Sequence, residues 1–168
     1  MRHATSRKSA FSLVELVIVI VIIGVLAAIA VPRISRGASG AGAAALRANL
    51  STLRKTIIYY SAEHAGAWPG ADGREDTLYD QLTLKTDAAG NVGTTAGVHI
   101  YGPYLNVGFP PVSVGPHPRA TRAHRNTDTP PRIDESKKNH GWVYNYKTGA
   151  IIANTNDLDA SGVGYDTY

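Results

Sequence analysis

The longest apolar run in the chain lies close to its N-terminus. It extends from Leu16 to Val31, sixteen residues relieved only by Gly24. Counted from Phe11, and including Ser12 and Glu15, the segment has 21 residues. As a helix it would cover about 31 Å, enough for the core of a bilayer. Because the run is apolar on every face and follows a basic N-terminus, it predicts a membrane helix rather than a helix of a soluble core.

A second hydrophobic pattern, with helical periodicity, follows after Pro32 and a glycine-rich stretch. Its apolar positions are three and four residues apart, which places them on one face of an amphipathic helix that must be buried against something. The helix is predicted to end near Gly66, before Trp68-Pro69-Gly70. The residues of this stripe are Leu46, Leu50, Leu53, Ile57, Tyr60 and His64.

The C-terminal half has weaker patterns. Residues Glu75 to Thr86 are typical of a short helix, and the proline-rich stretch from Asn106 to Arg132 is predicted to be a loop. Alternation from Trp142 to Ala153 predicts an antiparallel hairpin with Gly149 at the turn position that needs a positive φ. We therefore expect an α+β fold: a long N-terminal helix, transmembrane and then amphipathic, packed against a head with a small antiparallel sheet.

Composition narrows the function classes. The 168 residues carry 17 Lys and Arg against 13 Asp and Glu, a net charge of +4. Arg2, Arg7 and Lys8 lie in the first ten residues, so the remaining chain has 14 cations against 13 acids, or +1. This near-balance argues against nucleic-acid binding. The chain has no cysteine, which excludes disulfides and thiolate metal sites.

One short motif is specific. The sequence Lys8-Ser9-Ala10-Phe11-Ser12-Leu13-Val14-Glu15-Leu16, followed by the apolar run and Pro32, resembles the class III signal of type IV prepilins and type II secretion pseudopilins. The rest of the chain resembles the major pseudopilin more loosely, through Tyr59-Tyr60, Gly66-Ala-Trp68-Pro69 and Gly102-Pro-Tyr-Leu105. One departure is Ala10, where the family usually has glycine, and we expect slower cleavage there.

The resemblance implies a processing pathway. It implies a leader of residues 1–10, cleavage between Ala10 and Phe11 by a prepilin peptidase, and N-methylation of Phe11. It also implies that residues 11–32 form the membrane and polymerisation helix and residues 33–168 the pilin-like head. The subunit would reside in the inner membrane with its head in the periplasm, and then enter a homo-oligomeric filament built by the secretion or pilus machinery.

Glu15 has a physical reason to be in such a helix. A charged side chain at the centre of a membrane helix costs about 2.5–3.5 kcal/mol, so this carboxylate needs a partner. Cleavage would create one, the new ammonium group of Phe11, which a neighbouring subunit displaced along a filament can offer. Any other register would leave a buried charge unpaired. The simpler reading is a glutamate tolerated at the membrane interface.

Gly24 and Pro32 bracket a segment where the helix is predicted to melt when subunits pack. The alternative for both residues is an ordinary role in a membrane helix, where neighbouring helices tolerate glycine and proline.

The tail contains a possible calcium loop. Asp157, Asp159 and Ser161 place oxygen ligands at alternate positions before Gly162, as at the start of a calcium-binding loop, and Asp166 could complete the shell. The closing glutamate of such loops is missing. Because major pseudopilins are stabilised by calcium near this end, the resemblance also favours calcium, and a solvated acidic turn is the alternative.

Other site chemistry is unsupported. The histidines form no HExxH pair, no Gly-x-Ser-x-Gly elbow or phosphate-binding loop is present, and we expect no enzyme. His64 is predicted to be packed rather than catalytic.

Two alternatives stay open. The first is a soluble secreted protein whose signal peptide is cut after Ala28-Ile29-Ala30. The second is a minor pilin that binds DNA or a surface through the arginines of the proline-rich loop, Arg119, Arg122, Arg125 and Arg132.

Overall fold

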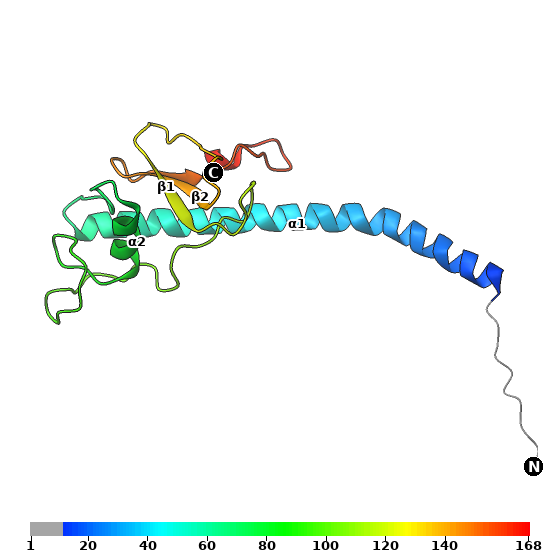
Figure 1. The fold of residues 1–168 in the computed structure, drawn as a ribbon, viewed down its shortest axis with the longest axis horizontal. Coiled ribbons are helices and arrows are strands. Elements are labelled where there is room, and N and C mark those ends of the chain that lie inside the picture. The colour runs from blue at the N-terminus through cyan, green and yellow to red at the C-terminus, as the bar shows by residue number, and fades with distance from the viewer. Residues whose placement is uncertain (1–11) are drawn as a thin grey trace, which may run out of the picture. The chain divides into compact units, whose positions relative to one another are not determined.

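The computed structural model describes residues 12–168, and the backbone within them forms three helices and one sheet (Figure 1). The first helix, α1, runs from Leu13 to Glu63, which confirms the predicted long helix up to one residue before His64. The described chain divides into two compact units, and the boundary along the sequence falls between Ala38 and Ser39, within α1. The second unit is the head, and it contains the rest of the elements.

The second half of α1 forms one wall of the head's core. Leu46, Leu50, Leu53 and Ile57 are each at most 1% exposed, as the stripe predicted. They pack in one cluster with residues of the sheet, among them Trp142 and Tyr144. His64 is also buried, with its ring stacked on that of Tyr60 at a centroid distance of 3.9 Å. The prediction that His64 is a packed residue is confirmed.

The helix α2, Glu75–Thr83, confirms the predicted short helix and ends three residues earlier than predicted. Leu84 ends it because its backbone is extended, at φ −117° and ψ 172°. Leu78 and Leu82 are buried and bring α2 onto the core. The tail ends in a short 3-10 helix, η1, Tyr165–Thr167, anchored by the buried ring of Tyr165.

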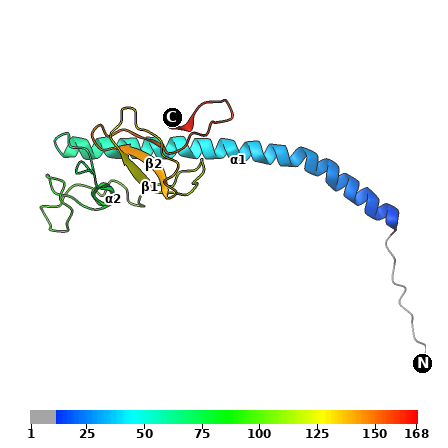
Figure 2. The same cartoon turned by 45° about the horizontal axis from the view of Figure 1, so that its top comes forward.

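The sheet has three strands in the order β1-β2-β3 (Figure 2). β2, His140–Asn145, pairs antiparallel with β3, Ile151–Ala153, which confirms the predicted hairpin. Gly149 between them has φ +72°, as that turn requires.

The remaining strand, β1, Arg122–Asn126, corrects two predictions. It lies inside the stretch predicted to be a loop, and it pairs parallel to β2, so the sheet is mixed rather than purely antiparallel. As an edge strand, β1 buries only Ala123, and its sequence Arg-Ala-His-Arg-Asn has none of the β-branched or aromatic residues that mark a strand. Backbone pairing with β2 holds it there.

Candidate assembly helix and tail loop

The first part of α1 presents its apolar side chains to the surroundings. The window Leu13–Ala30 has a mean hydropathy of 3.1, and none of its residues is buried within the chain. Its large apolar side chains are between 43% and 79% exposed, which is the reverse of a soluble core helix. By length and composition this helix is able to cross a membrane. Its surface therefore needs lipid or other protein chains to cover it.

Glu15 closes the first turn of this helix. The backbone N–H of Ser12 donates to the Glu15 carboxylate across 3.3 Å, and Leu16 N–H donates to the Ser12 carbonyl across 3.2 Å. Ser12 therefore occupies the cap position and Glu15 the third helical position, as in the glutamate half of a capping box. This capping role was not predicted from the sequence, although the pattern Ser-x-x-Glu indicates it. A glutamate in the first turn also suits the positive end of the helix dipole.

The structure shows less about the other predicted residues of this segment. Ala10 and Phe11 lie outside the described residues, so their roles in cleavage and methylation stay predictions. An added Cβ at Gly24 would meet no atom within 4 Å, so this glycine makes no close contact inside the chain. The backbone of α1 is helical through Pro32, whose side chain lies outside those described. Melting at Gly24 and Pro32 also stays a prediction.

Comparison with known protein families decides what this segment is similar to. Residues 5–31 match the prokaryotic N-terminal methylation motif. Searches among curated proteins and solved structures gave no match. The motif supports a type IV pilin-like family, and together with the apolar helix it fits a membrane-anchored pilin. The head, which the motif does not reach, is described by its structure alone.

The tail loop is organised around Asp159. Its Oδ1 accepts hydrogen bonds from the backbone N–H groups of Ser161, at 2.7 Å, and Val163, at 3.0 Å. Its Oδ2 accepts the Tyr168 hydroxyl at 2.5 Å and lies 3.5 Å from the Arg47 guanidinium. Arg47 also lies over the Tyr168 ring, 4.0 Å from its centroid. We call Arg47, Asp159 and Tyr168 the tail clasp.

The pKa values of Asp159 and Tyr168 in the tail clasp are shifted in the directions that favour their hydrogen bond. The hydrogen bond from Tyr168, followed by those from the backbone, holds the pKa of Asp159 below its usual value of 3.8. Desolvation raises the pKa of Tyr168, and its hydrogen bond to Asp159 acts in the same direction. Asp159 is thus favoured as the carboxylate and Tyr168 as the neutral phenol, the two forms that this hydrogen bond needs.

The predicted calcium ligands fit an ion poorly in this arrangement. Both oxygens of Asp159 already accept hydrogen bonds from the chain, and a calcium ion there would have to displace Tyr168. Asp157 and Asp166 are not part of the tail clasp. Among the side chains that the structure describes, no group of three or more histidine or acidic residues is placed to hold a metal. Calcium binding is tested only by titration, and the hydrogen bonds of the tail clasp favour the alternative, an acidic turn without an ion.

One of the four arginines of the proline-rich stretch, Arg122, forms an ion pair within the head. The Nε of Arg122 donates to Glu75 across 2.7 Å, and the same carboxylate contacts His140 at 3.3 Å. These contacts join β1 and β2 to α2 and give Arg122 a role within the head. They weaken the alternative of a basic patch for DNA.

Proposed function

We propose that this chain is a structural subunit, without enzymatic activity, of a type II secretion pseudopilus or type IV pilus-like filament. The observation that supports this most is an apolar helix, Leu13–Ala30, with no residue buried in its own chain and with the methylation motif at its start. A prepilin peptidase would remove residues 1–10 and leave Phe11 as the first residue. The resemblance of the head favours the pseudopilin over the pilus.

The same helix would serve two environments. In the membrane its surface is solvated by lipid, and in a filament it is covered by the helices of other copies. Burying one Val, Leu or Ile side chain is worth about 1.5–3 kcal/mol relative to water, so extraction from the membrane is unfavourable unless other copies replace the lipid. This is a physical reason for polymerisation through the helix rather than release of single subunits.

Glu15 would set the register of that packing. Among the described groups its carboxylate accepts only the Ser12 N–H and forms no ion pair. The Phe11 ammonium of a neighbouring copy would supply that compensation after cleavage. A buried carboxylate without a cation is costly, so only a stagger that brings the two groups together would be stable.

The proposal includes location and partners. The head would lie in the periplasm while the helix is anchored in the inner membrane, and the filament would be assembled by the secretion or pilus machinery. The partners are therefore other copies of the chain, the prepilin peptidase, the machinery and lipid. Nucleic acid is not among them, because the mature chain is almost neutral.

The mature N-terminus tests this proposal. Intact-mass and N-terminal peptide analysis of the full chain, co-expressed with a prepilin peptidase, is expected to show a chain that begins at methylated Phe11. Without the peptidase, residues 1–10 should stay attached. A chain that begins at Val31 in both cases would establish the ordinary signal peptide and overturn the filament proposal.

A further inference from the structure

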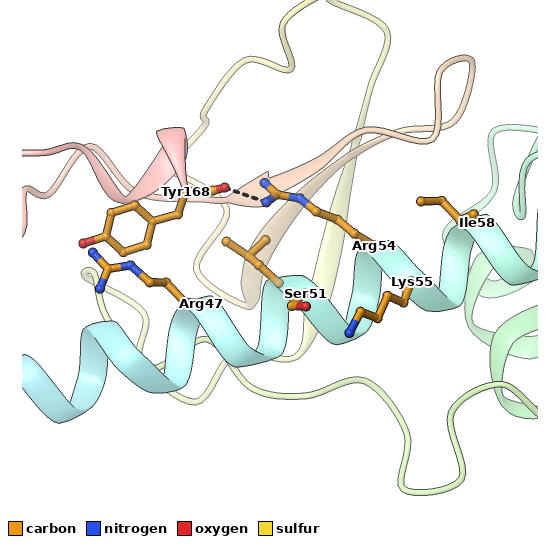
Figure 3. A pocket seen from close by; sticks show the side chains of 7 residues that line it. Arg47, Ser51, Arg54, Lys55, Ile58 and Tyr168 are labelled. Carbon is orange, nitrogen blue, oxygen red and sulfur yellow. Dashed lines mark hydrogen bonds between the residues drawn. The ribbon is translucent and has the colours of Figure 1, made fainter.

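A basic hollow lies between α1 and the tail of the head (Figure 3). Its volume is about 460 Å³, and its lining includes three cations and no acid. Arg47 and Arg54 point toward Tyr168, and Arg54 donates to the Tyr168 backbone oxygen at 2.5 Å, whereas Lys55 points away from it. The tail therefore contacts two of the three cations of the hollow and leaves the charge of Lys55 without a contact from the tail.

Three exposed residues of this lining, together with Tyr59 beyond it, form a regular row on α1. Arg47, Ser51, Lys55 and Tyr59 follow one another at every fourth position, so they lie along one line of the helix surface. All four are exposed, and Tyr59 is 63% exposed. Read toward the end of α1, this basic row passes from cationic to aromatic.

Residues of opposite charge lie on and beside α2. Asp76 and Asp80 are one turn apart on the helix, Asp72 precedes it in a turn and Leu84 directly follows it. All four are exposed, and together we call them the acidic row. Asp72 caps its own turn by accepting the Arg74 N–H and the Thr77 hydroxyl. Leu84, 46% exposed, directly follows the helix. Read in the same direction, this acidic row passes from anionic to apolar.

The two rows do not satisfy one another within a single copy. In Figure 2, α2 and the C-terminal segment beside the hollow lie on opposite sides of α1. Among the described side chains the ion pairs are Arg47–Asp159, Arg122–Glu75 and His140–Glu75, so Lys55, Asp76 and Asp80 have no such pair there. Their charges are available to another molecule.

We propose that the acidic row of one copy docks on the basic row of the next copy. Two helices that pack face to face lie about 8–10 Å apart, close enough for Lys55 to reach Asp80 or Asp76 and for Tyr59 to cover Leu84. The order of the residues is complementary when the rows run the same way. Charge complementarity of this kind fixes the register and rejects wrong partners.

The geometry of such a contact explains why it would extend. The two rows are different surfaces of the same head, so the contact is head-to-tail and each new copy presents both surfaces again. Head-to-tail contacts that do not close into a ring generate open helical filaments. This inference rests on the proposed function and adds to it a contact between heads, separate from the packing of the apolar helices.

A charge exchange tests the contact in the full chain, co-expressed with the peptidase and assembly machinery. Lys55→Glu and Asp80→Lys, each alone, are expected to lower the yield of sheared filaments about tenfold, because each places like charges together. The double variant Lys55→Glu/Asp80→Lys should restore most of the yield. Lys137→Glu is the matched control, the same charge change at an exposed loop position, and it should assemble as the wild type does.

The melting temperature of the head should be unchanged in all four variants, so that misfolding does not explain a loss. Normal assembly of both single variants, or a double variant no better than either, would overturn the docking of these rows. Loss without rescue would assign Lys55 to another acidic partner, which also overturns it.

Cross-linking separates failure of this contact from failure of the filament proposal. The chain has no cysteine, so Ser51→Cys and Asp76→Cys can be introduced together and oxidised in intact cells. Dimers joined through these two positions are expected even if filaments are absent. If filaments form and no such dimer appears, the contact is wrong and the proposed function stands.

Discussion

The two halves of α1 are equally helical and differ in what covers them. From Leu13 to Ala30 no residue is buried, although every large side chain except Glu15 is apolar. From Ala43 to Tyr60 most of the large apolar residues occupy one stripe, which is almost completely buried in the head's core, and only Ile58 and Tyr59 are exposed. Only the second half of α1 is thus covered by other parts of its own chain.

This difference separates folding from assembly. The second half is stabilised by tertiary packing, as most helices are, and it belongs to the head's own stability. The first half contributes nothing to that core, so its sequence is shaped by whatever lies outside the chain. An apolar surface on nearly every side suits lipid, and in the proposed filament it would suit a bundle of identical helices.

The difference between the two halves of α1 is tested most directly by making the same substitution in each. Leu53→Ala should lower the free energy of unfolding of the head by about 2–5 kcal/mol, because it leaves a cavity in the core. Leu26→Ala, at a side chain 61% exposed, should change it by less than about 0.5 kcal/mol. Denaturant unfolding of the full chain in detergent, followed by Trp142 fluorescence, measures both. Equal effects would show that the two halves do not differ as described.

A smaller effect is expected from the tail clasp. Tyr168→Phe removes the hydroxyl that donates to Asp159 and should lower the head's melting temperature by less than Leu53→Ala does.

With the tail clasp intact, millimolar calcium and a chelator should give the same melting temperature, because both oxygens of Asp159 already accept hydrogen bonds from the chain. A clear rise with calcium that Asp159→Ala removes would establish the calcium loop and contradict the clasp.

The smallest effect is a dependence on pH. A carboxylate whose pKa is lowered by folding stabilises the native state above its unfolded pKa of 3.8, and this contribution is lost as the pH falls through the lower folded value. The difference in melting temperature between wild type and Asp159→Asn should therefore be complete at pH 6 and shrink below pH 3.8. A difference that grows on acidification would contradict the assigned charge state.

Strong periodicity made much of this fold predictable. The stripe from Leu46 to Tyr60 and the alternation from Trp142 to Ala153 each repeat at the spacing of their element, and both are present. The edge strand β1 was not predictable, because its residues are polar and its pairing depends on a partner that follows later in the chain. Parallel pairing needs a crossover, which no local pattern announces.

The candidate sites were predictable to different degrees. Glu15 was predicted through its motif, whereas its hydrogen bond with the Ser12 N–H was not, although the Ser-x-x-Glu spacing is typical of a helix cap. In the tail, alternating oxygens suggested a metal loop, yet the same residues serve equally well to accept backbone N–H groups in a turn. Ligand-like spacing cannot distinguish these uses without Arg47 and Tyr168, which come from distant positions.

Assembly of two Glu15 variants tests the central claim most directly, that other copies cover the first half of α1. Glu15→Gln keeps a side-chain oxygen for the Ser12 N–H and removes the charge, whereas Glu15→Ala removes both. The measurement is the amount of subunit in sheared filaments relative to the amount in the membrane. We expect both variants to reach the membrane, be cleaved at Phe11 and fail to enter filaments. Normal assembly of Glu15→Gln would show that Glu15 acts only as a helix cap, and normal assembly of both would contradict the account.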